Sequence, residues 1–230
     1  MTMPFYVSPE QVMKDRADYA RKGIARGRSL TAVVFDAGIL ICAETTSNTL
    51  RKVSEIYDRI AFAGVGRYNE FDQLRIAGVR HADLKGYAFS REDVDARSLA
   101  NAYAQMLGNI FTHEMKPMEV EILVGEVGAE PDGDRLFRIL FDGQVFQEEG
   151  FSVLGGDSET IVERLGDPNT TGLDLSGALL RAVGALAGPD RQLGPADLEV
   201  AILDRGAPRR AFRRVKDPEL EQLLGTTPSA

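Results

Sequence analysis

The order of strand-like and helix-like segments constrains the fold of this chain more than any other feature. Short apolar runs rich in Val, Ile and Phe come in blocks, separated by longer segments with helical periodicity. The strand-like runs span residues 31–35, 38–43, 52–56, 60–65, 119–127, 135–141, 151–154, 198–203 and 209–215. The helix-like segments span residues 8–26, 68–85, 91–114, 158–165, 175–186 and 218–224. Segments grouped in this way predict an α+β domain with mainly antiparallel sheets, because βαβ units would alternate strands and helices.

Two sheets stacked face to face, with helices outside, would cover the apolar faces of all these segments. Asp36-Ala37-Gly38 joins the first two strands and Tyr57-Asp58-Arg59 joins the next two, so both pairs are predicted to be hairpins. No stretch of linker composition divides the chain. Residues 1–230 are therefore interpreted as one domain, with a frayed tail at 225–230.

The first helix has the clearest predicted boundaries. Ser8 is the expected N-cap, Pro9 takes the first helical position, and Gln11 is placed to close a capping box. Gly27 predicts the end of the helix. A thin apolar stripe of mostly small residues runs along it: Met13, Ala17, Ala20 and Ile24. Such a stripe allows close approach of another element, either in the same domain or in a neighbouring subunit.

The helix expected over 91–114 takes Ser90 as its N-cap. Its large apolar residues recur at helical spacing on one face: Leu99, Tyr103, Met106, Leu107 and Ile110. We therefore expect that face to pack against the core.

The formal net charge of −8 disfavours nucleic acid as a binding partner, because nucleic-acid binders usually carry a basic surplus. The segment 205–216 is a local exception and contains Arg209, Arg210, Arg213 and Arg214. One interpretation is a phosphate-binding patch. The favoured interpretation is a solvated edge strand whose charges discourage edge-to-edge pairing.

The sequence carries no signal for a cofactor, a metal or a membrane. Cys42 is the only cysteine and stands in an apolar run, so we expect it to behave as a small buried hydrophobe. With one cysteine and only His81 and His113, a structural zinc site is not expected. The N-terminus lacks the features of a signal peptide, and no apolar run reaches the ~20 residues of a membrane helix. We expect a cytoplasmic protein without membrane partners.

Gly64-Val65-Gly66 follows a strand and precedes a helix, an arrangement that hints at dinucleotide binding. The third glycine of that motif is replaced by Asn69, and the neighbouring strands are not expected to form parallel βαβ units. A strand-to-helix turn is the favoured interpretation.

Several motifs occur in a fixed order along the chain. They are Ser8-Pro9-Glu10-Gln11, the stretch from Ala20 to Arg26, Tyr57-Asp58-Arg59, Asn69-Glu70-Phe71-Asp72, the stretch from Leu99 to Gln105, and the stretch from Pro208 to Arg214. As an ordered set covering nearly the whole chain, they resemble the proteasome family of the N-terminal-nucleophile hydrolase fold, and within it the α subunits of actinobacteria. The resemblance implies a four-layer αββα sandwich of two mainly antiparallel sheets flanked by helices, with an additional N-terminal helix.

The resemblance also implies an assembly. Seven α subunits would form a homo-heptameric ring, and two such rings would cap two rings of catalytic β subunits. The helix over 8–27 would lie on the outer ring surface, and residues 1–7 would plug the axial pore. The gate residues would be Met3, Pro4, Phe5, Tyr6 and Val7. A ring-shaped regulatory ATPase would dock on the α ring and feed tagged, unfolded protein substrates into the chamber.

The gate departs from the pattern of archaeal and eukaryotic α subunits, which carry Tyr-Asp-Arg near the N-terminus. Here Phe5-Tyr6-Val7 precedes Ser8 without an Asp-Arg pair, and Tyr57-Asp58-Arg59 lies elsewhere. The plug is therefore expected to be more apolar than the gate of archaeal and eukaryotic α subunits.

Three residues match the family's binding site for an activator tail. Lys52 matches a lysine that pairs with the tail's terminal carboxylate, and a compact ammonium suits such a group. Gly27 matches a glycine whose backbone contacts the same tail, and Pro9 matches a proline that shifts when the gate opens. Each residue also has a plainer interpretation. Lys52 would be a solvated strand residue, Gly27 a helix C-cap and Pro9 a first helical residue.

The family's β subunits use an N-terminal threonine, whose free α-amine activates its own hydroxyl. The matching position here is Arg28, which has no nucleophilic hydroxyl, so the chain is expected to be non-catalytic. The alternative is a self-processing hydrolase in which Ser29 or Thr31 becomes the nucleophile, with Lys52 and Glu44 as its companions. Thr31 is also simply a β-branched residue opening a strand.

A general interaction module is the remaining class. It would predict a folded protein without sevenfold symmetry and without a β partner. The thin stripe of the first helix and the apolar N-terminus favour ring assembly.

Overall fold

The computed structural model describes residues 8–47 and 49–225. Within these ranges the helices are α1 (Pro9–Ile24), α2 (Tyr68–Ala88), α3 (Ala96–His113), α4 (Ser158–Leu165), α5 (Leu175–Ala187) and α6 (Asp217–Leu223). The strands are β1 (Leu30–Phe35), β2 (Gly38–Glu44), β3 (Val53–Tyr57), β4 (Ile60–Gly66), β5 (Val120–Glu126), β6 (Arg135–Ile139), β7 (Val145–Glu148), β8 (Phe151–Leu154), β9 (Leu198–Asp204) and β10 (Phe212–Arg214).

The strands form two five-stranded sheets in which every neighbouring pair is antiparallel. Sheet A has the order β10-β9-β2-β1-β8, and sheet B has the order β3-β4-β5-β6-β7. Both predicted hairpins, β1–β2 and β3–β4, are confirmed.

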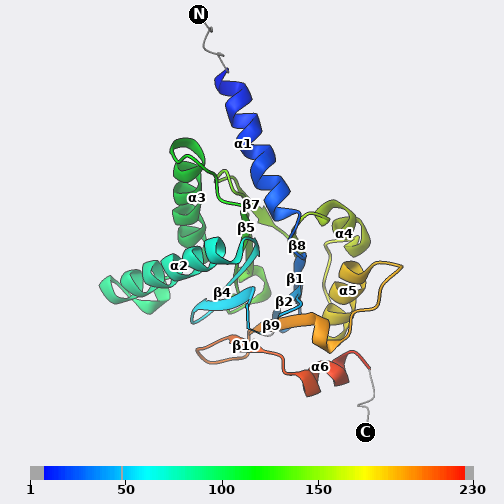
Figure 1. Ribbon diagram of the computed structural model, residues 1–230. Coiled ribbons are helices and arrows are strands. Elements are labelled where there is room, and N and C mark those ends of the chain that lie inside the picture. Colours follow the sequence, from blue (N-terminus) through cyan, green and yellow to red (C-terminus); the bar gives the residue numbers. More distant parts are fainter. Residues whose placement is uncertain (1–7, 48, 226–230) are drawn as a thin grey trace, which may run out of the picture.

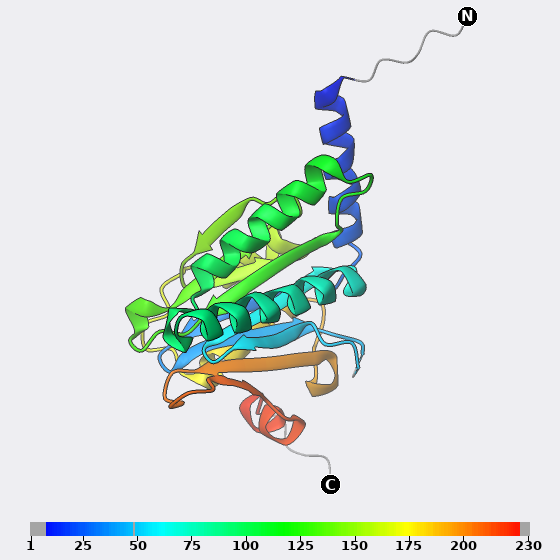
Figure 2. The same cartoon turned by 90° about the vertical axis from the view of Figure 1, so that its left-hand side faces the viewer.

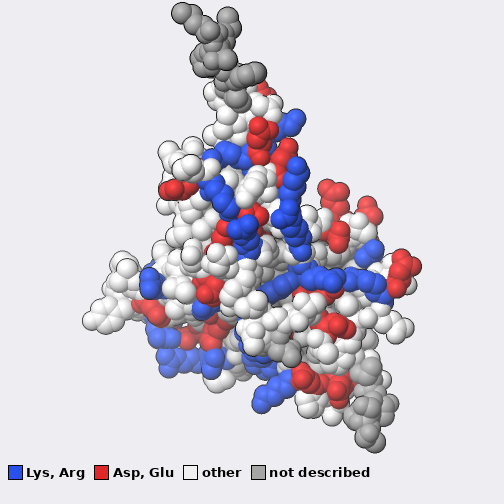
Figure 3. All heavy atoms as spheres, viewed as in Figure 1, with Lys and Arg blue, Asp and Glu red and all other residues white. Residues whose placement is uncertain are grey.

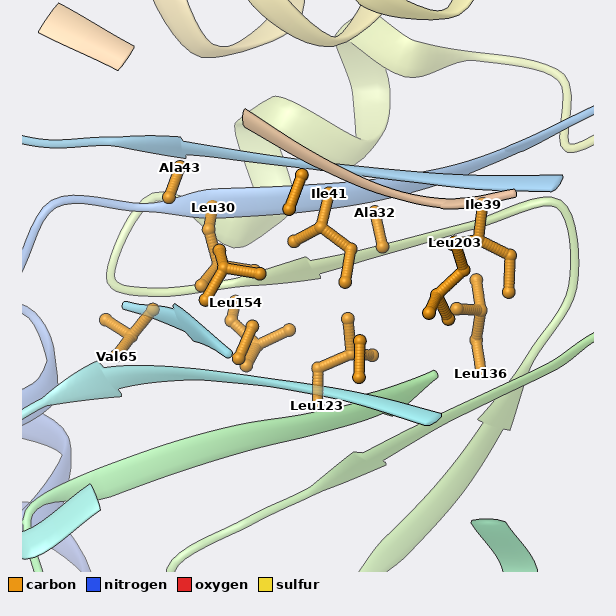
Figure 4. Close-up of a cluster of buried hydrophobic side chains, with 14 of the residues drawn as sticks. Leu30, Ala32, Ile39, Ile41, Ala43, Val65, Leu123, Leu136, Leu154 and Leu203 are labelled. Carbon is orange, nitrogen blue, oxygen red and sulfur yellow. The ribbon is translucent and has the colours of Figure 1, made fainter. Parts of the chain in front are cut away.

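One apolar layer lies between the two sheets. In β1, Leu30 and Ala32 point into this layer, whereas Val33 and Phe35 belong to the core on the other face of sheet A. Successive side chains of a strand lie on opposite faces, so a strand buried on both faces shows a continuous apolar run. Figure 4 shows the layer, with Leu30 and Ala32 facing Leu123 of sheet B.

Helices cover the outer face of each sheet (Figures 1 and 2). Leu179 and Leu186 of α5 pack on sheet A, and Leu99 and Tyr103 of α3 pack on sheet B. The predicted four-layer αββα sandwich is therefore confirmed. Cys42 lies in the core between sheet A and its helices, and burial raises the pKa of its thiol to about 12. It is the small buried hydrophobe that the sequence predicts.

Helix α1 projects from the sandwich, and only its C-terminal end is buried in it (Figures 1 and 2). Ser8 caps it as predicted, since its Oγ accepts the Gln11 backbone N–H at 3.2 Å. The Gln11 side chain donates to Asp15 at 2.7 Å. The predicted apolar stripe is buried only in part, because Met13 lies on the projecting half and is 38% exposed.

One arginine fastens the middle of α1 to the end of α3. The Arg16 guanidinium donates to four backbone carbonyls, of Phe111 at 2.8 Å, Ile110 at 3.2 Å, Glu114 at 2.6 Å and Met115 at 3.3 Å. The last carbonyls of a helix have no partner within the helix, and the C-terminal end of its dipole attracts a cation. Arg16 satisfies both needs and sets the direction in which α1 leaves the body.

The start of α3 differs from the prediction. Ser90 caps a short 3-10 turn, Arg91–Asp93, and Val94 is extended, so the α-helix begins only at Ala96. Its N-cap is Asp95, whose Oδ1 accepts the Ser98 N–H at 2.8 Å. The sequence contains two competing caps five residues apart, and the extended Val94 stops the first from extending.

The predicted apolar face of α3 is mostly correct. Leu99, Tyr103 and Leu107 are buried, and Ile110 is half-buried. The prediction that Met106 packs against the core is wrong, because this side chain is 38% exposed at the margin of the face.

Two strand predictions also change. Strand β7 was not predicted, because Val145 to Gln147 are exposed at the edge of sheet B and show no alternation of apolar and polar residues. Strand β10 is an edge strand as predicted, but it is shorter than the expected 209–215.

The arginines of segment 205–216 are neutralised by carboxylates of the same chain. The pairs are Arg205–Asp134 at 2.7 Å, Arg209–Asp58 at 3.6 Å, Arg210–Glu55 at 2.6 Å, Arg213–Glu219 at 2.8 Å, and Arg214–Glu199. This pairing disfavours the phosphate-binding interpretation.

Gly66 ends β4 with a φ of 108°, and α2 begins at Tyr68. A β-carbon at Gly66 would lie 1.9 Å from the Glu119 carbonyl oxygen, so close backbone approach requires a glycine there. The expected strand-to-helix turn is confirmed. In the described ranges, no helix is both long enough and apolar enough to span a membrane.

Candidate functional site

Lys52 immediately precedes β3 of sheet B and is hydrogen-bonded to residues in or next to β1, β2 and β9 of sheet A. Its Nζ donates to the backbone carbonyls of Arg28 at 2.7 Å and Glu44 at 2.8 Å, just before β1 and at the end of β2. Its backbone N–H donates to Glu199 Oε2 of β9 at 2.8 Å. The lysine is therefore held at both ends, with its stem half-buried.

The carboxylates near Lys52 are occupied by arginines. Glu44 pairs with Arg28 and with Arg191, each at 2.9 Å, and Glu199 pairs with Arg214. Among the described residues, no carboxylate forms an ion pair with Nζ, and both of its hydrogen-bond acceptors are backbone carbonyls. The ammonium thus keeps one N–H and its full charge for another partner.

Burial lowers the pKa of Lys52 to about 8. The charges of Glu44 and Glu199 act to raise this pKa, and the charge of Arg28 acts to lower it. Desolvation prevails because it disfavours the charged form of a half-buried amine, and both acids are already paired with arginines.

An open pocket of about 630 Å³ lies beside this lysine, between the end of α1 and helices α4 and α5. Gly27, Arg28, Ser29 and Glu44 form part of its wall. Three further guanidinium groups line it: Arg26, Arg164 and Arg191. Figure 3 shows Lys and Arg side chains gathered on the face between the base of α1 and the α4–α5 pair.

Gly27 is not the helix C-cap that the sequence suggests. The cap is Ala25 in right-handed geometry, and Gly27 is not among the glycines with positive φ. The site favours a glycine because there is little room for a side chain. A β-carbon at Gly27 would lie 3.1 Å from Val65 Cγ1 and 3.3 Å from the Gly66 nitrogen. Its backbone is left open to the pocket.

The structure does not bring Pro9 to this site within one chain. Pro9 begins α1, whereas Gly27 follows its end, and 15 helical steps separate Pro9 from Ile24 by roughly 22 Å. The proposed gate residues Met3 to Val7 lie outside the described residues.

The two hydroxyls of the hydrolase alternative are both buried. Thr31 Oγ1 donates to the Ser152 carbonyl at 3.1 Å and is 0% exposed. Ser29 is 6% exposed and packs so closely on Gly155 that a β-carbon there would lie 2.5 Å from its Oγ. Ser29 lines the pocket next to Arg28, whose guanidinium pairs with Glu44 at 2.9 Å.

Sequence reasoning did not identify Arg191, Arg164 or Arg26 as parts of this site. Arg191 meets Glu44 across 147 residues of chain, and no local motif marks such a contact. Only the fold brings α4, α5 and the end of α1 around one pocket.

A model of the family described as proteasome subunit matches residues 24–203. The chain belongs to the proteasome family. The matched region contains Gly27 and Lys52, together with the pocket beside them, and begins after Pro9.

Proteasome family relatives extend the similarity to almost the full length. The proteasome subunit alpha of Acidimicrobium ferrooxidans is 59% identical over 228 residues, covering 99% of this chain and 98% of that protein. The protein of the same name from Sanguibacter keddieii is 56% identical over 231 residues, covering 98% and 91%. That of Thermobifida fusca is 53% identical over 227 residues, covering 97% and 91%. Helix α1 is therefore included in the similarity.

Proposed function

We propose that this chain is a non-catalytic α-ring subunit of a cytoplasmic proteasome core particle, where it gates substrate entry and docks a regulatory ATPase. The names of its relatives support the α-ring role. Its partners would be six further copies of the chain, proteasome β subunits, the ATPase ring and unfolded protein substrates. One observation carries the docking proposal: Lys52 is an ammonium without an ion partner, next to an open pocket.

The chemistry of Lys52 suits a chain-terminal carboxylate. Its two carbonyl bonds fix Nζ in place, so little side-chain entropy is lost when a third partner arrives. The incoming carboxylate would supply the missing counter-charge, and the Gly27 backbone is close enough to the same pocket to receive the tail. Pro9, at the start of α1, would shift in the same event as the gate opens.

A non-catalytic role agrees with the surroundings of the nucleophile position. Helix α1 is fastened by Arg16 and by its buried Ala20 and Ile24, so the segment preceding β1 is part of the fold. Self-processing at Ser29 or Thr31 would remove this helix, and both residues are buried in the folded chain.

Tail binding is expected to weaken as pH rises through about 8. Below that value Lys52 is protonated and attracts a carboxylate, and above it the amine of the free site becomes neutral. A synthetic peptide ending in the ATPase's C-terminal sequence should bind the particle about tenfold less tightly at pH 9 than at pH 7. Fluorescence anisotropy measures this. The same peptide amidated at its C-terminus should show no such dependence, and an equal loss for both peptides would contradict the role of Lys52.

Removing residues 2–7 is expected to accelerate hydrolysis of small peptides by the assembled particle several-fold, without the ATPase. These residues would plug the pore, so their loss removes a barrier to entry. Peptidase assays on the full-length and shortened particles measure the effect. An unchanged rate would show that residues 2–7 do not restrict entry to the chamber.

A further inference from the structure

The open pocket between the end of α1 and helices α4 and α5 carries more positive than negative charge. Among the described residues that line it are four guanidinium groups and three carboxylates, those of Glu44, Asp157 and Asp190. Arg28 and Arg191 both pair with Glu44 at 2.9 Å, so one carboxylate serves two of the arginines. One further carboxylate would balance the charge of the pocket, whose basic side chains are exposed on the face seen in Figure 3.

The other two guanidinium groups of the pocket have no carboxylate partner. Arg26 forms no hydrogen bond or ion pair with any described residue, and Arg164 donates only to the Ala185 carbonyl, at 3.1 Å. A guanidinium presents a planar fork of N–H donors that matches the two oxygens of a carboxylate. These two arginines are therefore available to an acid from outside the chain.

This pocket adjoins the docking lysine directly. Lys52 Nζ donates to the backbone carbonyls of Arg28 and Glu44, and both residues line the pocket. Arg26 stands two residues before Arg28, and Gly27 between them presents no side chain. An extended chain advances about 3.3–3.6 Å per residue, so a tail whose terminal carboxylate lies on Nζ would reach Arg26 within about two to four residues.

We propose that Arg26 and Arg164 form a second subsite, which binds an acidic side chain of the docking tail a few residues before its terminal carboxylate. This inference rests on the proposed function, because it names a further feature of the tail that docks at Lys52. A tail with two negative groups would meet two separate positive centres, the ammonium and the arginine pair. The subsite would thus select tails that carry an Asp or Glu from tails that share only their last residue.

An acidic side chain on the tail suits this subsite better than a free anion. The pocket is open and its arginines are exposed, so an isolated anion in water would gain little from them. A tail already held at Lys52 presents its side chain at a high effective concentration, and the second contact then costs little additional entropy.

The test measures binding of synthetic peptides to the assembled particle by fluorescence anisotropy. The peptides end in the ATPase's last residue, are otherwise uncharged, and carry one Glu at the second, third, fourth or fifth position from the end. Gln at the same position is the comparison. At the best position we expect the Glu peptide to bind about three- to fivefold more tightly, the upper range for an exposed ion pair. Equal affinities of the Glu and Gln peptides at every position would overturn the proposal.

The substitution Arg26→Gln assigns the preference to the pocket. It should reduce the preference for Glu to less than about twofold and leave the affinity of the Gln peptide unchanged, because only the Glu peptide uses this guanidinium. Arg80→Gln is the matched control. Arg80 is exposed on α2, whose buried residues pack on sheet B, and it forms no hydrogen bond or ion pair with any described residue. If both variants prefer Glu equally, Arg26 does not bind the acid.

Charge reversal gives a readout that loss of structure would not produce. An Arg26→Glu particle should bind a peptide with Lys at the best position about threefold more tightly than the Glu peptide. A continued preference for Glu would contradict the subsite.

Amidation of the peptide C-terminus separates this proposal from docking at Lys52. If amidation abolishes binding and Glu has no effect, docking at Lys52 stands and the arginine subsite fails. If Glu strengthens binding and amidation changes nothing, the arginines bind the acid and docking through the terminal carboxylate fails.

Discussion

The substitution Lys52→Met is expected to abolish stimulation of proteolysis by the regulatory ATPase. Methionine keeps much of the length of the side chain but removes an ammonium whose hydrogen-bond partners are two carbonyls and no carboxylate. A charge-assisted hydrogen bond of this kind contributes roughly 2–3 kcal/mol, which is about 30- to 150-fold in affinity for each tail. Degradation of a tagged protein by the particle and the ATPase measures the effect.

The same substitution removes the bonds to the Arg28 and Glu44 carbonyls, so the integrity of the particle must be measured alongside. Native mass and thermal midpoint of the variant particle provide that control. An ATPase that lacks its own C-terminal residue should reproduce the loss with the unaltered particle. Normal stimulation of an intact Lys52→Met particle would exclude docking through this lysine.

The substitution Gly23→Ala is expected to destabilise the protein by about 2–4 kcal/mol. A β-carbon at Gly23 would lie 2.1 Å from Oε2 and 2.6 Å from Cγ of Glu119, so the whole side chain must move. Glu119 is 3% exposed and pairs with Arg67 at 2.9 Å and Lys116 at 3.1 Å. Displacing this buried carboxylate breaks both pairs and loosens α1 from β5. Urea denaturation of the full chain measures the free energy of unfolding.

Gly184→Ala is the matched control, because it makes the same change inside another helix. Gly184 is exposed in α5, and a β-carbon there meets nothing within 4 Å. Alanine should therefore stabilise the protein by about 0.5–1 kcal/mol, the usual gain over glycine in a helix. Equal effects of the two substitutions would show that the contact with Glu119 is not the cause.

Local patterns were sufficient for most of the architecture. The capped start of α1, the two hairpins and the buried faces of α3 follow from turn residues, caps and periodicity, which depend on neighbours in sequence. Prediction failed where two local signals compete, as with Ser90 and Asp95 before α3. It also failed for β7, where an exposed edge strand needs no apolar alternation.

The candidate site could be predicted only in part. Lys52 and Gly27 were singled out by resemblance to a family, and the fold places both next to one pocket wall. The reason that Lys52 is available to a ligand could not be read from the sequence, because it depends on long-range pairs. Arg191 forms an ion pair with Glu44, and Arg214 forms one with Glu199. Each acid is thus neutralised by an arginine from a distant segment of the chain.

The contacts of Arg16 could not be predicted from the sequence either. Arg16 is one of many charged residues on the polar side of a helix, yet its four carbonyl partners all lie at the end of α3, about a hundred residues away. These contacts depend on the tertiary fold, which brings the end of α3 next to the middle of α1.

The most direct test of the central claim is a pair of mass spectra, native and denaturing, of the particle that this chain forms in its own cytoplasm. We expect a sevenfold particle containing the full-length chain and a second chain that begins with threonine. A chain cut to begin at Ser29 or Thr31 would contradict it, because that product would identify a self-processed hydrolase with Lys52 in its active site.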